Sequence, residues 1–457
     1  METTSIKIVE VLQKAGYEAY WAGGCVRDLL MGKKPHDYDI ATSALPEQIE
    51  EIIKSTHILK GKTIPIGKKF GVIMAIVGGH HFEIASFRSD SDLSDGRRPD
   101  AVFFTNAKED AKRRDFTING MFYDPITHAV IDYVGGEDDL KRQVIRFIGD
   151  PEQRIREDYL RIIRGVRFKF TFGFTYETRT EQAIREHAHL IRKTSTERIK
   201  DEISKMWKAV RSHHLSCDLV IQELEHAGLL KEILPEIEVM KSTPQPPQFH
   251  AEGDVYIHTL RCLKALHHQT PERVIWGVLL HDVGKPAVIH RDGDLISFHG
   301  HEKAGVEIAM GILKRLHFRK VDREHILWLI EHHMMLYNFE KMKKSTRRRW
   351  FMHPWFADLL QVMYADSVGT SPVNMDEYNR LEALYEQERD EKLLEPMKPL
   401  LSGDDVMHAF GLKPGAEVGE LIRLAHDAQI EGTVQDREQA LEYLRKVARV
   451  RGRLAFK

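Results

Sequence analysis

Two aspartates separated by a single residue are the first candidates for chemistry in this sequence. Asp37 and Asp39 come directly before a run of small residues at positions 40–44. Residues two apart in an extended chain project on the same face, so the two carboxylates would point together. Such a pair binds a divalent cation such as Mg²⁺ together with substrate phosphates, as nucleotidyl transfer requires. The same spacing also occurs in ordinary solvated acidic turns, so the neighbouring residues must decide.

A glycine turn lies just upstream of this pair. Gly23 and Gly24 follow a short apolar stretch and precede an expected helix that carries Arg27. Glycine lets backbone N–H groups come close to phosphate oxygens, and a helix amino terminus together with an arginine favours negative charge. The alternative is a tight turn between a strand and a helix with no ligand.

Cationic clusters follow downstream, at Arg97-Arg98 and at residues 112–114. Their charge would suit a triphosphate, although such clusters are most often solvated surface. Asp115 and Asn119 follow the second cluster and could hydrogen-bond a ribose or a base. Together with the glycine turn, they describe a nucleotide site around the aspartate pair.

Glu157, Asp158 and Arg161 stand at i, i+1 and i+4 on a predicted helix, so Glu157 and Arg161 share a face. A carboxylate accepts from an exocyclic amine and arginine donates to ring nitrogens and carbonyls, so these groups could read a base. Without further context, a solvated ion pair contributing about 0.3 to 0.5 kcal/mol would explain them as well.

A second group of candidates gathers beyond residue 250. These are histidines and aspartates at intervals on expected helices, and such ligands build sites for divalent transition metals. A single histidine is most often a satisfied polar residue, but a succession around the sequence His281-Asp282-Val283-Gly284-Lys285 is not explained in that way. The set comprises His258, His281, Asp282, His299, His301, His332, His333 and Asp366.

The elements that must position these residues fall into an amino-terminal mixed part and a helical remainder. Segments 72–77 and 82–87 read as a hairpin with Gly78-Gly79 at the turn. After residue 140 strand signals largely vanish and apolar residues recur at helical spacing. A Pro-rich stretch at 242–247 is the expected linker, and a polar, Glu-rich connection is expected after residue 370. We therefore predict an α+β fold, with a mixed head followed by helical domains.

Composition narrows the class of protein. A chain of 457 residues with 42% hydrophobic and 30% charged residues predicts two to four soluble domains. The sequence has no apolar run of roughly 18 residues and no signal-peptide pattern at its start, so we expect a cytoplasmic protein without membrane contact. Net charge is −2, yet residues 141–212 hold 18 Lys and Arg against 10 Asp and Glu. We expect Cys25, Cys217 and Cys262 to take no part in the chemistry.

The order and spacing of the amino-terminal motifs closely resemble the class II tRNA nucleotidyltransferases of the polymerase-β-like superfamily, which also include bacterial poly(A) polymerases. The motifs are GGCVRD at 23–28, HDYDIATSA at 36–44, FRSDSDLSDGRRPD at 87–100, AKRRDFTINGMFYDP at 111–125 and REDYLRIIRGVRF at 156–168.

The resemblance implies a role for each matching residue. Asp37 and Asp39 would carry Mg²⁺ and activate the 3′-hydroxyl of the primer, and Glu83 is a candidate third carboxylate. The nucleotide would be held by Gly24 and Arg27 at its phosphates, by Arg114 and Asp115 at nucleotide and ribose, by Asp158 and Arg161 at the base, and by Arg164 and Arg167 along the same stripe.

Residues 250–370 resemble the HD superfamily of metal-dependent phosphohydrolases. The resemblance implies that His258, His281, Asp282 and Asp366 hold a divalent transition metal. His301 and His333 would complete a two-metal version, with His299 and His332 as the alternatives that spacing leaves open. The HD part is then either an active phosphohydrolase or a body that only binds tRNA.

The implied organisation is a head at 1–140, a neck at 141–241, an HD domain at 248–370 and a helical tail at 371–457. The implied activity is addition of CMP and AMP from CTP and ATP to the 3′ end of tRNA. The alternatives are an enzyme that adds only CC or only A, a poly(A) polymerase, and an HD phosphohydrolase acting on RNA ends. The expected partners are tRNA, ATP and CTP, and oligomeric state stays open.

Overall fold

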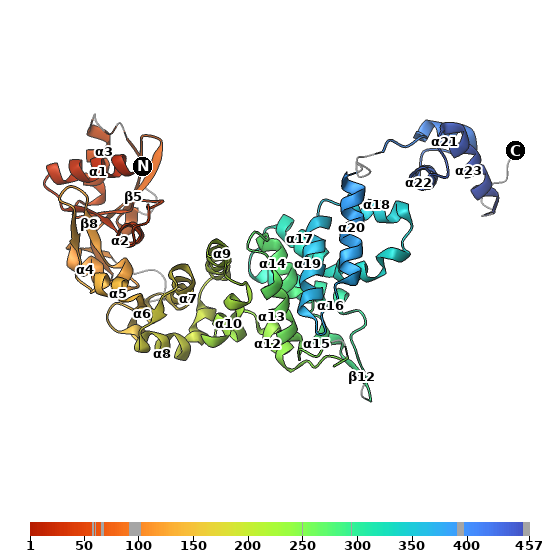
Figure 1. The fold of residues 1–457 in the computed structure, drawn as a ribbon. Coiled ribbons are helices and arrows are strands. Elements are labelled where there is room, and N and C mark those ends of the chain that lie inside the picture. Colours follow the sequence, from red (N-terminus) through yellow and green to blue (C-terminus); the bar gives the residue numbers. More distant parts are fainter. Residues whose placement is uncertain are drawn as a thin grey trace. The chain divides into compact units, whose positions relative to one another are not determined.

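The structure is a computed structural model that describes residues 1–56, 59, 61–64, 68–90, 102–248, 250–293, 295–390 and 397–450. Its contacts divide the chain into two compact units (Figure 1). Unit 1 comprises Met1–Glu238 with Arg315–His317, and unit 2 comprises Val239–Lys314 with Phe318–Lys457. The predicted cationic cluster Arg97-Arg98 lies outside the described residues. Among the helices described, none is long and apolar enough to cross a membrane.

A mixed sheet of seven strands organises the start of unit 1, in the order β3-β4-β5-β2-β1-β8-β9. β2 and β5 pair in parallel, and the other neighbouring strands are antiparallel. The predicted hairpin is confirmed, because β4 and β5 join through Gly78 and Gly79, both at positive φ. The strands are β1 Ala19–Ala22, β2 Ile40–Thr42, β3 Lys62–Ile64, β4 Val72–Val77, β5 His80–Ser86, β8 Phe122–Asp124 and β9 Ala129–Ile131, with β6 Arg88–Asp90 and β7 Val102–Phe104 paired separately.

Short helices pack on this sheet and close its core. Ile8, Trp21, Val26, Ile49 and Ile84 are among the buried residues of one cluster that joins helices to strands. Because apolar residues recur at helical spacing in these segments, each helix turns one face to the sheet. The helices are α1 Glu2–Lys14, α2 Gly24–Leu30, α3 Pro46–Ser55, α4 Ala107–Lys112 and α5 Gly136–Arg142, with the 3₁₀ turns η1 Lys68–Phe70 and η2 Thr117–Asn119.

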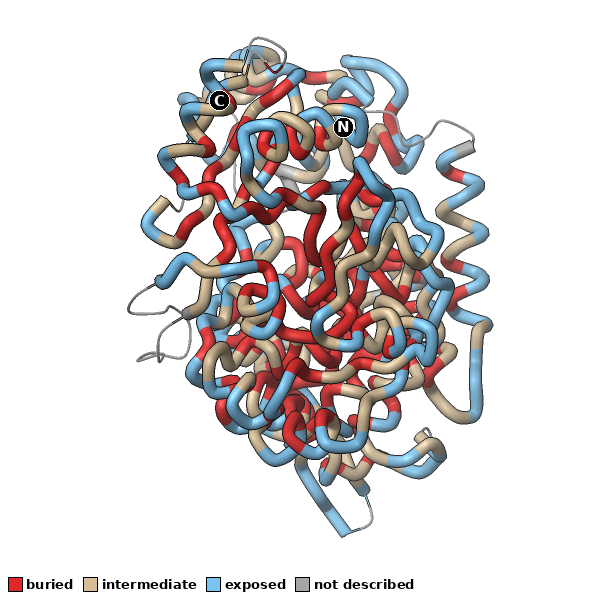
Figure 2. Tube along the Cα trace, turned by 90° about the vertical axis from the view of Figure 1, so that its left-hand side faces the viewer, coloured by how far each residue is buried: buried red, intermediate tan, exposed pale blue. Residues whose placement is uncertain are grey.

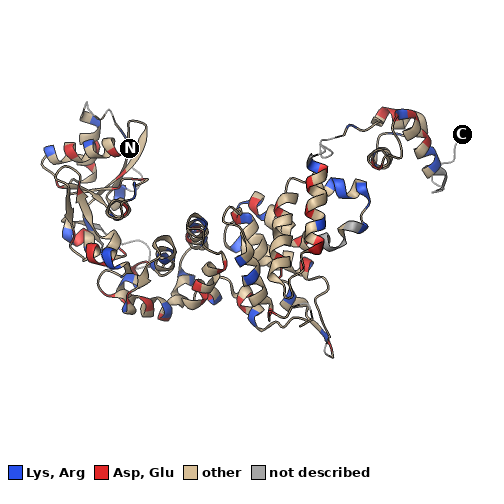
Figure 3. Cartoon of the chain, viewed as in Figure 1, with Lys and Arg blue, Asp and Glu red and all other residues tan. Residues whose placement is uncertain are grey.

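Helices dominate the rest of unit 1, as the sequence predicts. A short parallel pair, β10 Val144–Ile145 with β11 Thr175–Tyr176, interrupts them. Lys and Arg residues lie along α7 and α9 and are drawn in blue in Figure 3. The helices are α6 Pro151–Glu157, α7 Arg161–Phe172, α8 Thr178–Glu186, α9 Thr196–Ser212, α10 Asp218–His226, α11 Leu230–Ile233 and α12 Pro235–Val239, with η3 Ala188–Lys193.

Unit 2 is a helical body in which α13 packs against α14 and α19. The Pro-rich stretch predicted as a linker is built into this unit. Pro244 forms an isolated β-bridge with Asp254, and the side-chain oxygen of the buried Gln245 accepts a hydrogen bond from Lys285 Nζ. The helices are α13 Val255–Ala265, α14 Glu272–Leu280, α15 Lys285–Val288, α16 His301–Arg315, α17 Lys320–His332, α18 Lys344–Phe351 and α19 Phe356–Gly369, with η4 Met240–Ser242, η5 His333–Lys341 and the hairpin β12 His290–Asp292 and β13 Leu295–Ser297.

The tail contains a helix where the sequence suggested a polar connection. Residues Asp376–Asp390 form α20, with Tyr378 and Leu381 buried. Glu, Leu, Ala and Arg are strong helix formers, so this polar composition favours a helix over a loop. Buried and exposed positions alternate along most helices (Figure 2). The remaining helices are α21 Gly403–Phe410, α22 Ala416–Ile430 and α23 Arg437–Val450.

Candidate functional site

The aspartate pair lies in extended chain that leads into β2. Asp37 and Asp39 are exposed, while Tyr38 between them is buried and its ring centre lies 4.6 Å from that of Trp21. The backbone of Asp39 accepts from Ala22 N at 3.0 Å, which ties this segment to β1. Asp37, Tyr38 and Asp39 are exposed, buried and exposed in turn, which is the pattern of an extended segment with both carboxylates on one face.

Glu83 joins the pair from the neighbouring strand. The parallel register aligns Ile40 with Ile84, so Glu83 lies beside Asp39. Although Asp39 is exposed to the cleft, surrounding protein partly desolvates its carboxyl. This desolvation, together with the negative charge of Glu83, raises the pKa of Asp39 to about 6. Carboxylates held this close repel one another, and a divalent cation with oxygen ligands relieves the repulsion. The residues present therefore fit a divalent metal.

The glycine turn directs the chain from β1 into α2. Gly23 has φ +74°, a conformation that a residue with a side chain rarely adopts, and an added Cβ would lie 3.1 Å from Arg114 Nη1. On α2, the guanidinium of Arg27 donates to Asn119 Oδ1 at 2.6 Å and lies 4.3 Å from the centre of the Phe172 ring. The turn thus brings Arg27 and Arg114 to the same place.

A cleft of about 460 Å³ in unit 1 collects most of the predicted nucleotide site. Asp37 is not among the described residues that line it. The predicted residues on its walls are Gly24, Arg27, Asp39, Arg114, Asp115, Asp158, Arg161, Arg164 and Arg167, and they are joined by Gly23, Arg113, Asn119, Phe168 and Arg198.

Asp115 is buried at the base of this cleft and pairs with Arg164 of α7, whose Nε donates at 2.8 Å. Burial alone would raise the pKa of this carboxyl, but the charges of Arg164 and Arg161 hold it below its ordinary value. Asn119 also donates to Asp115, at 3.2 Å. The carboxylate is therefore ionised and fixed in place.

Asp158 is not on a helix, and that part of the prediction is wrong. α6 ends at Glu157, and Asp158 has extended backbone because its side chain accepts from Leu160 N at 3.1 Å and competes with the helical bond. Arg198 of α9 donates to its carboxylate at 2.9 Å. Arg198 lies 40 residues further along the chain, and no local pattern identified it.

Arg161 begins α7 and is held by several acceptors. Its guanidinium donates to Glu157 Oε2 at 2.6 Å and to the backbone oxygens of Arg113 and Arg154 at 2.9 and 3.0 Å. The predicted pairing of Glu157 with Arg161 is thus present, across a break between two helices. Arg167 pairs with the buried Glu202, and its guanidinium lies 4.0 Å from the Phe168 ring centre.

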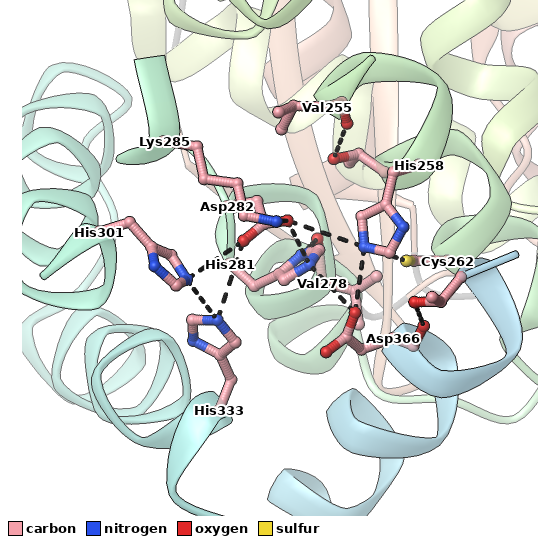
Figure 4. A network of polar contacts seen from close by, with 12 residues as sticks. Val255, His258, Cys262, Val278, His281, Asp282, Lys285, His301, His333 and Asp366 are labelled. Carbon is pink, nitrogen blue, oxygen red and sulfur yellow. Dashed lines mark hydrogen bonds and ion pairs between the residues drawn. The ribbon is translucent and has the colours of Figure 1, made fainter. Parts of the chain in front are cut away.

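The predicted histidines and aspartates of unit 2 converge on a buried cluster (Figure 4). His258 comes from α13, Asp366 from α19, and His281 and Asp282 from the end of α14. The alternatives left open by spacing are placed as follows. His301 and His333 are in the cluster, His299 is exposed nearby, and His332 bonds Trp328 O through Nδ1 at 2.8 Å.

Each histidine of the cluster has its Nδ1 bonded outward. Backbone oxygens at Val278, Phe298 and Ile330 lie 2.7, 2.9 and 2.7 Å from Nδ1 of His281, His301 and His333, respectively. Carbonyl oxygens can only accept, so Nδ1 carries the proton and Nε2 presents a lone pair to the cluster. For His258 the outward partner is a carboxylate, Glu252, whose Oε1 lies 3.0 Å from Nδ1.

The inward atoms form an arrangement that calls for a cation. Nε2 of His301 and Nε2 of His333 are 3.1 Å apart. Burial and the nearby His281 lower the pKa of His333 to about 3, so its ring is neutral. Nε2 of His281 is buried without a hydrogen-bond partner among the described residues, and Oδ2 of Asp282 is ion-paired with Lys285 Nζ at 2.6 Å. These donors fit divalent metals of the transition series, as predicted.

Asp282 lies between two halves of the cluster. Its Oδ2 is 3.2 Å from His281 Nε2 and 3.7 Å from His258 Nε2, while Oδ1 is 3.4 Å from His301 Nε2. Burial opposes its ionisation, but the neighbouring His281 and the ammonium of Lys285, whose Nζ is 2.6 Å from Oδ2, hold the pKa of Asp282 well below its ordinary value. The two oxygens of this ionised carboxylate therefore face the two halves of the cluster.

A pocket of about 650 Å³ opens onto one half of this cluster. Asp282, His301 and Asp366 reach its wall, together with Lys285 and the ring of Phe298. Two residues of the cluster were missed by sequence reasoning. One is Glu252, whose side chain is fully buried behind His258. The other is Cys262, which we expected to take no part in the chemistry and which lies inside the cluster.

The geometry defines a polymerase-β-like nucleotidyltransferase head joined to an HD domain, and comparisons with known families agree. Residues 19–146 match the family described as "Poly A polymerase head domain". Residues 173–241 match "Probable RNA and SrmB- binding site of polymerase A", and residues 255–366 match "HD domain". These matches confirm the resemblance to class II tRNA nucleotidyltransferases that carry an HD domain.

Curated relatives of the chain are named CCA-adding enzyme. The one from Lactobacillus helveticus is 44% identical over 203 residues, which is 44% of this chain and 49% of the relative. The one from Bacillus pumilus is 39% identical over 237 residues, which is 52% of this chain and 56% of the relative. The chain thus spans about half the length of the curated relatives it matches.

Solved structures resemble the chain over nearly its full length. The CCA-adding enzyme of Bacillus stearothermophilus in complex with CTP has a TM-score of 0.70 and 25% identity, covering 98% of each chain. The Thermotoga maritima CCA-adding enzyme complexed with tRNA has a TM-score of 0.61 and 20% identity, covering 97% of this chain and 94% of that one. The predicted fold is therefore confirmed.

Proposed function

We propose that this chain adds CMP and AMP from CTP and ATP to the 3′ end of tRNA without a nucleic-acid template. The observation that carries the proposal is the cleft of unit 1. There Asp39, crowded by acidic neighbours, shares one cavity with Asp158 and with seven arginines of the described lining, and Arg161, Arg164 and Arg167 of these lie on α7. The names of the curated relatives and of the structure bound to CTP support the same activity.

Different residues of the cleft bind the metal and the phosphates in the proposed reaction. Asp37 and Asp39 hold the divalent metal, for which we propose Mg²⁺, and Glu83 lies beside Asp39 as a candidate third carboxylate. When bound, that ion lowers the pKa of the attacking 3′-hydroxyl and neutralises the triphosphate. Arg27 and Arg114 hold phosphate oxygens beside Gly24, since a guanidinium matches them with two parallel hydrogen bonds.

The base meets Asp158 and Arg161 at the junction of α6 and α7. Asp158 accepts from the exocyclic amine that cytosine and adenine share, and Arg161 donates to ring nitrogens or carbonyls. Guanine and uracil present a carbonyl where cytosine and adenine present that amine. Asp115, fixed by Arg164, positions the ribose, and Arg164 with Arg167 extends the cationic wall.

The tRNA binds through its phosphates to the basic segment at 141–212, so its affinity falls as salt rises. We propose addition of the complete CCA end. Enzymes limited to CC or to A, and a poly(A) polymerase, are the alternatives. The proposed domain limits stay at 1–140, 141–241, 248–370 and 371–457, and the proposed location is the cytoplasm.

Purified protein incubated with tRNAs that lack A, CA or CCA, each with one labelled triphosphate at a time, tests the proposal. We expect CMP on tRNA lacking CCA and AMP on tRNA lacking A, with pyrophosphate released. Incorporation of AMP alone identifies the A-adding alternative. No incorporation with any tRNA at millimolar Mg²⁺ contradicts the proposal.

A second function, metal-dependent phosphohydrolysis, is supported by the buried cluster of unit 2. Four histidines whose Nδ1 atoms are bonded outward, two ionised aspartates and a pocket that reaches Asp282 and His301 form a set that an inert tRNA-binding body does not require. Phosphomonoester and phosphodiester substrates, assayed with Mn²⁺, Co²⁺, Ni²⁺ and Mg²⁺, test it. Hydrolysis that persists in His281→Ala rules this site out as its source.

A further inference from the structure

Cys262 lies among the atoms that face the inner half of the cluster. It follows His258 by one helical turn on α13, so both side chains are on one face. Its Sγ is 3.4 Å from His258 Nε2, and the residue is fully buried (Figure 4). The candidate ligand atoms of His258, Cys262, His281 and Asp366 all lie within 4.8 Å of one another.

Close packing of two helices holds the thiol there. A Cβ added to Gly369 at the end of α19 would lie 2.4 Å from Cys262 Sγ and 3.0 Å from its backbone nitrogen. Only glycine leaves this space, and any larger residue would push the sulfur or the helix away. The thiol therefore has little freedom to turn out of the cluster.

An independent observation indicates that a cation belongs at the same point. Nε2 of His281 is buried, has no hydrogen-bond partner among the described residues and faces the cluster. Such an atom costs about 1 to 3 kcal/mol when left unsatisfied. Nε2 of His258 also faces the cluster, 3.0 Å from Asp366 Oδ1, while its Nδ1 is bonded outward to Glu252.

The spacing of these atoms matches a tetrahedral ion. Zn–S bonds of about 2.3 Å and Zn–N bonds of about 2.0 Å place N and S roughly 3.5 Å apart. The separation between His258 Nε2 and Cys262 Sγ is 3.4 Å, and Asp366 Oδ1 lies 3.0 and 3.9 Å from the Nε2 atoms of His258 and His281.

We propose that the Cys262 thiolate is a ligand of an inner cation in the HD domain, together with His258, His281 and Asp366. This rests on the metal site of the second proposed function. One sulfur, two nitrogens and one oxygen select Zn²⁺ or Co²⁺ over Mg²⁺, and binding displaces the thiol proton to solvent.

The proposed inner ion has four protein ligands and no open position, as in structural sites. The outer half, at Asp282, His301 and His333, keeps positions open. The pocket reaches Asp282 and His301 and, of the inner set, only Asp366, while the described lining includes neither Cys262 nor His281. Substrate would therefore meet the outer ion, and the inner one would hold Asp366 and His281 in place.

Cobalt spectroscopy of the full chain tests this assignment. The host is Cys25→Ser/Cys217→Ser, in which Cys262 is the sole thiol. Chelated protein is titrated with Co²⁺ while bound metal and near-ultraviolet absorption are measured. We expect a thiolate-to-cobalt charge-transfer band to grow with the first equivalent bound in unit 2. Adding Cys262→Ser should remove the band and weaken Co²⁺ binding roughly tenfold or more, since lost ligand support has effects of this size.

Each remaining outcome has a definite meaning. His258→Ala keeps the thiol and removes its neighbour, so the band should shift or disappear. Stoichiometric Co²⁺ binding that His281→Ala reduces, but without any thiolate band, overturns the role of Cys262 and leaves the HD site intact. Binding that His281→Ala does not reduce overturns both. Circular dichroism and thermal unfolding of the full chain report whether unit 2 is folded in each variant.

Discussion

The cleft of unit 1 and the buried cluster of unit 2 both gather carboxylates, but in opposite surroundings. Asp37 and Asp39 are exposed, and Asp39 shares its cleft with arginines, whereas Asp282 and Asp366 are buried among histidines. Exposed oxygen ligands suit Mg²⁺, which keeps waters and shares its coordination with phosphates. Buried nitrogen and oxygen ligands suit a transition metal that the protein itself encloses. One chain can thus hold two kinds of ion for two reactions.

Removing one ligand from each region gives the largest expected effect. Asp37→Ala should lower nucleotide addition by more than about a thousandfold, because several kcal/mol of charge stabilisation are lost, and should leave hydrolysis unchanged. His281→Ala should do the reverse. Initial rates of both reactions, measured on the same preparations, check this.

Asp138→Ala is the matched control, since this aspartate is exposed on α5 and pairs only across the surface with Arg142. It should alter neither reaction. If either Asp37→Ala or His281→Ala abolished both activities, the two regions would not be independent sites.

Ion pairs within unit 1 also differ in how far they are buried. Asp115→Asn removes the buried partner of Arg164 and should lower the free energy of unfolding by about 3 kcal/mol, because an unpaired guanidinium is left at the base of the cleft. Asp138→Asn breaks an exposed pair with side chains 68% and 63% accessible, and should cost less than about 0.5 kcal/mol. Chemical denaturation at pH 7 measures both.

The pH dependence of this difference has a definite sign. The folded-state pKa of Asp115 is depressed, so its contribution is present above the unfolded pKa of about 4 and is lost as pH falls through the folded value. The gap between wild type and Asp115→Asn should therefore shrink below pH 4. A gap that widened there would contradict the assigned pair.

Local patterns were sufficient for much of this comparison. The hairpin at β4 and β5 and the turn at Gly23 follow from periodicity and glycine, which are properties of short segments. The HD ligands were implied by the resemblance to the HD superfamily, since spacing left His299 or His301 and His332 or His333 open. The segment at 376–390 was read as a connection because polarity was weighed above helix propensity.

Contacts between distant segments could not be predicted in the same way. Arg198 reaches Asp158 from 40 residues away, and Cys262 enters the cluster because α13 and α19 pack closely at Gly369. The side chain of Asp158 also breaks the helix on which it was expected, through a hydrogen bond to Leu160 N. These features depend on tertiary packing that spacing alone does not encode.

Base selection should respond more weakly than chemistry. Asp158→Ala removes the acceptor proposed for the amine and frees Arg198, so discrimination of CTP and ATP against UTP and GTP should fall by about 1 to 3 kcal/mol, or 5- to 150-fold. The ratio of kcat/KM values for the four triphosphates measures this. Glu152→Ala, at an exposed position of α6, is the control and should leave the ratio unchanged. Unaltered discrimination in Asp158→Ala would assign base selection elsewhere.

The smallest expected effect concerns Glu83. Its negative charge crowds Asp39 in the cleft, whereas the carboxylates of the unit 2 cluster are paired with histidines. Asp39 binds a cation when ionised, and its pKa is raised to about 6 by desolvation and by Glu83. At limiting Mg²⁺, addition should therefore rise with pH up to about 6 and level off above it, with roughly a tenfold loss at pH 5. Glu83→Gln removes one cause of the raised pKa, so the inflection should move to lower pH while the plateau stays within a few fold of wild type. A plateau that instead collapses in Glu83→Gln would make Glu83 a required metal ligand, because loss of a neighbouring charge alone changes only the position of the inflection.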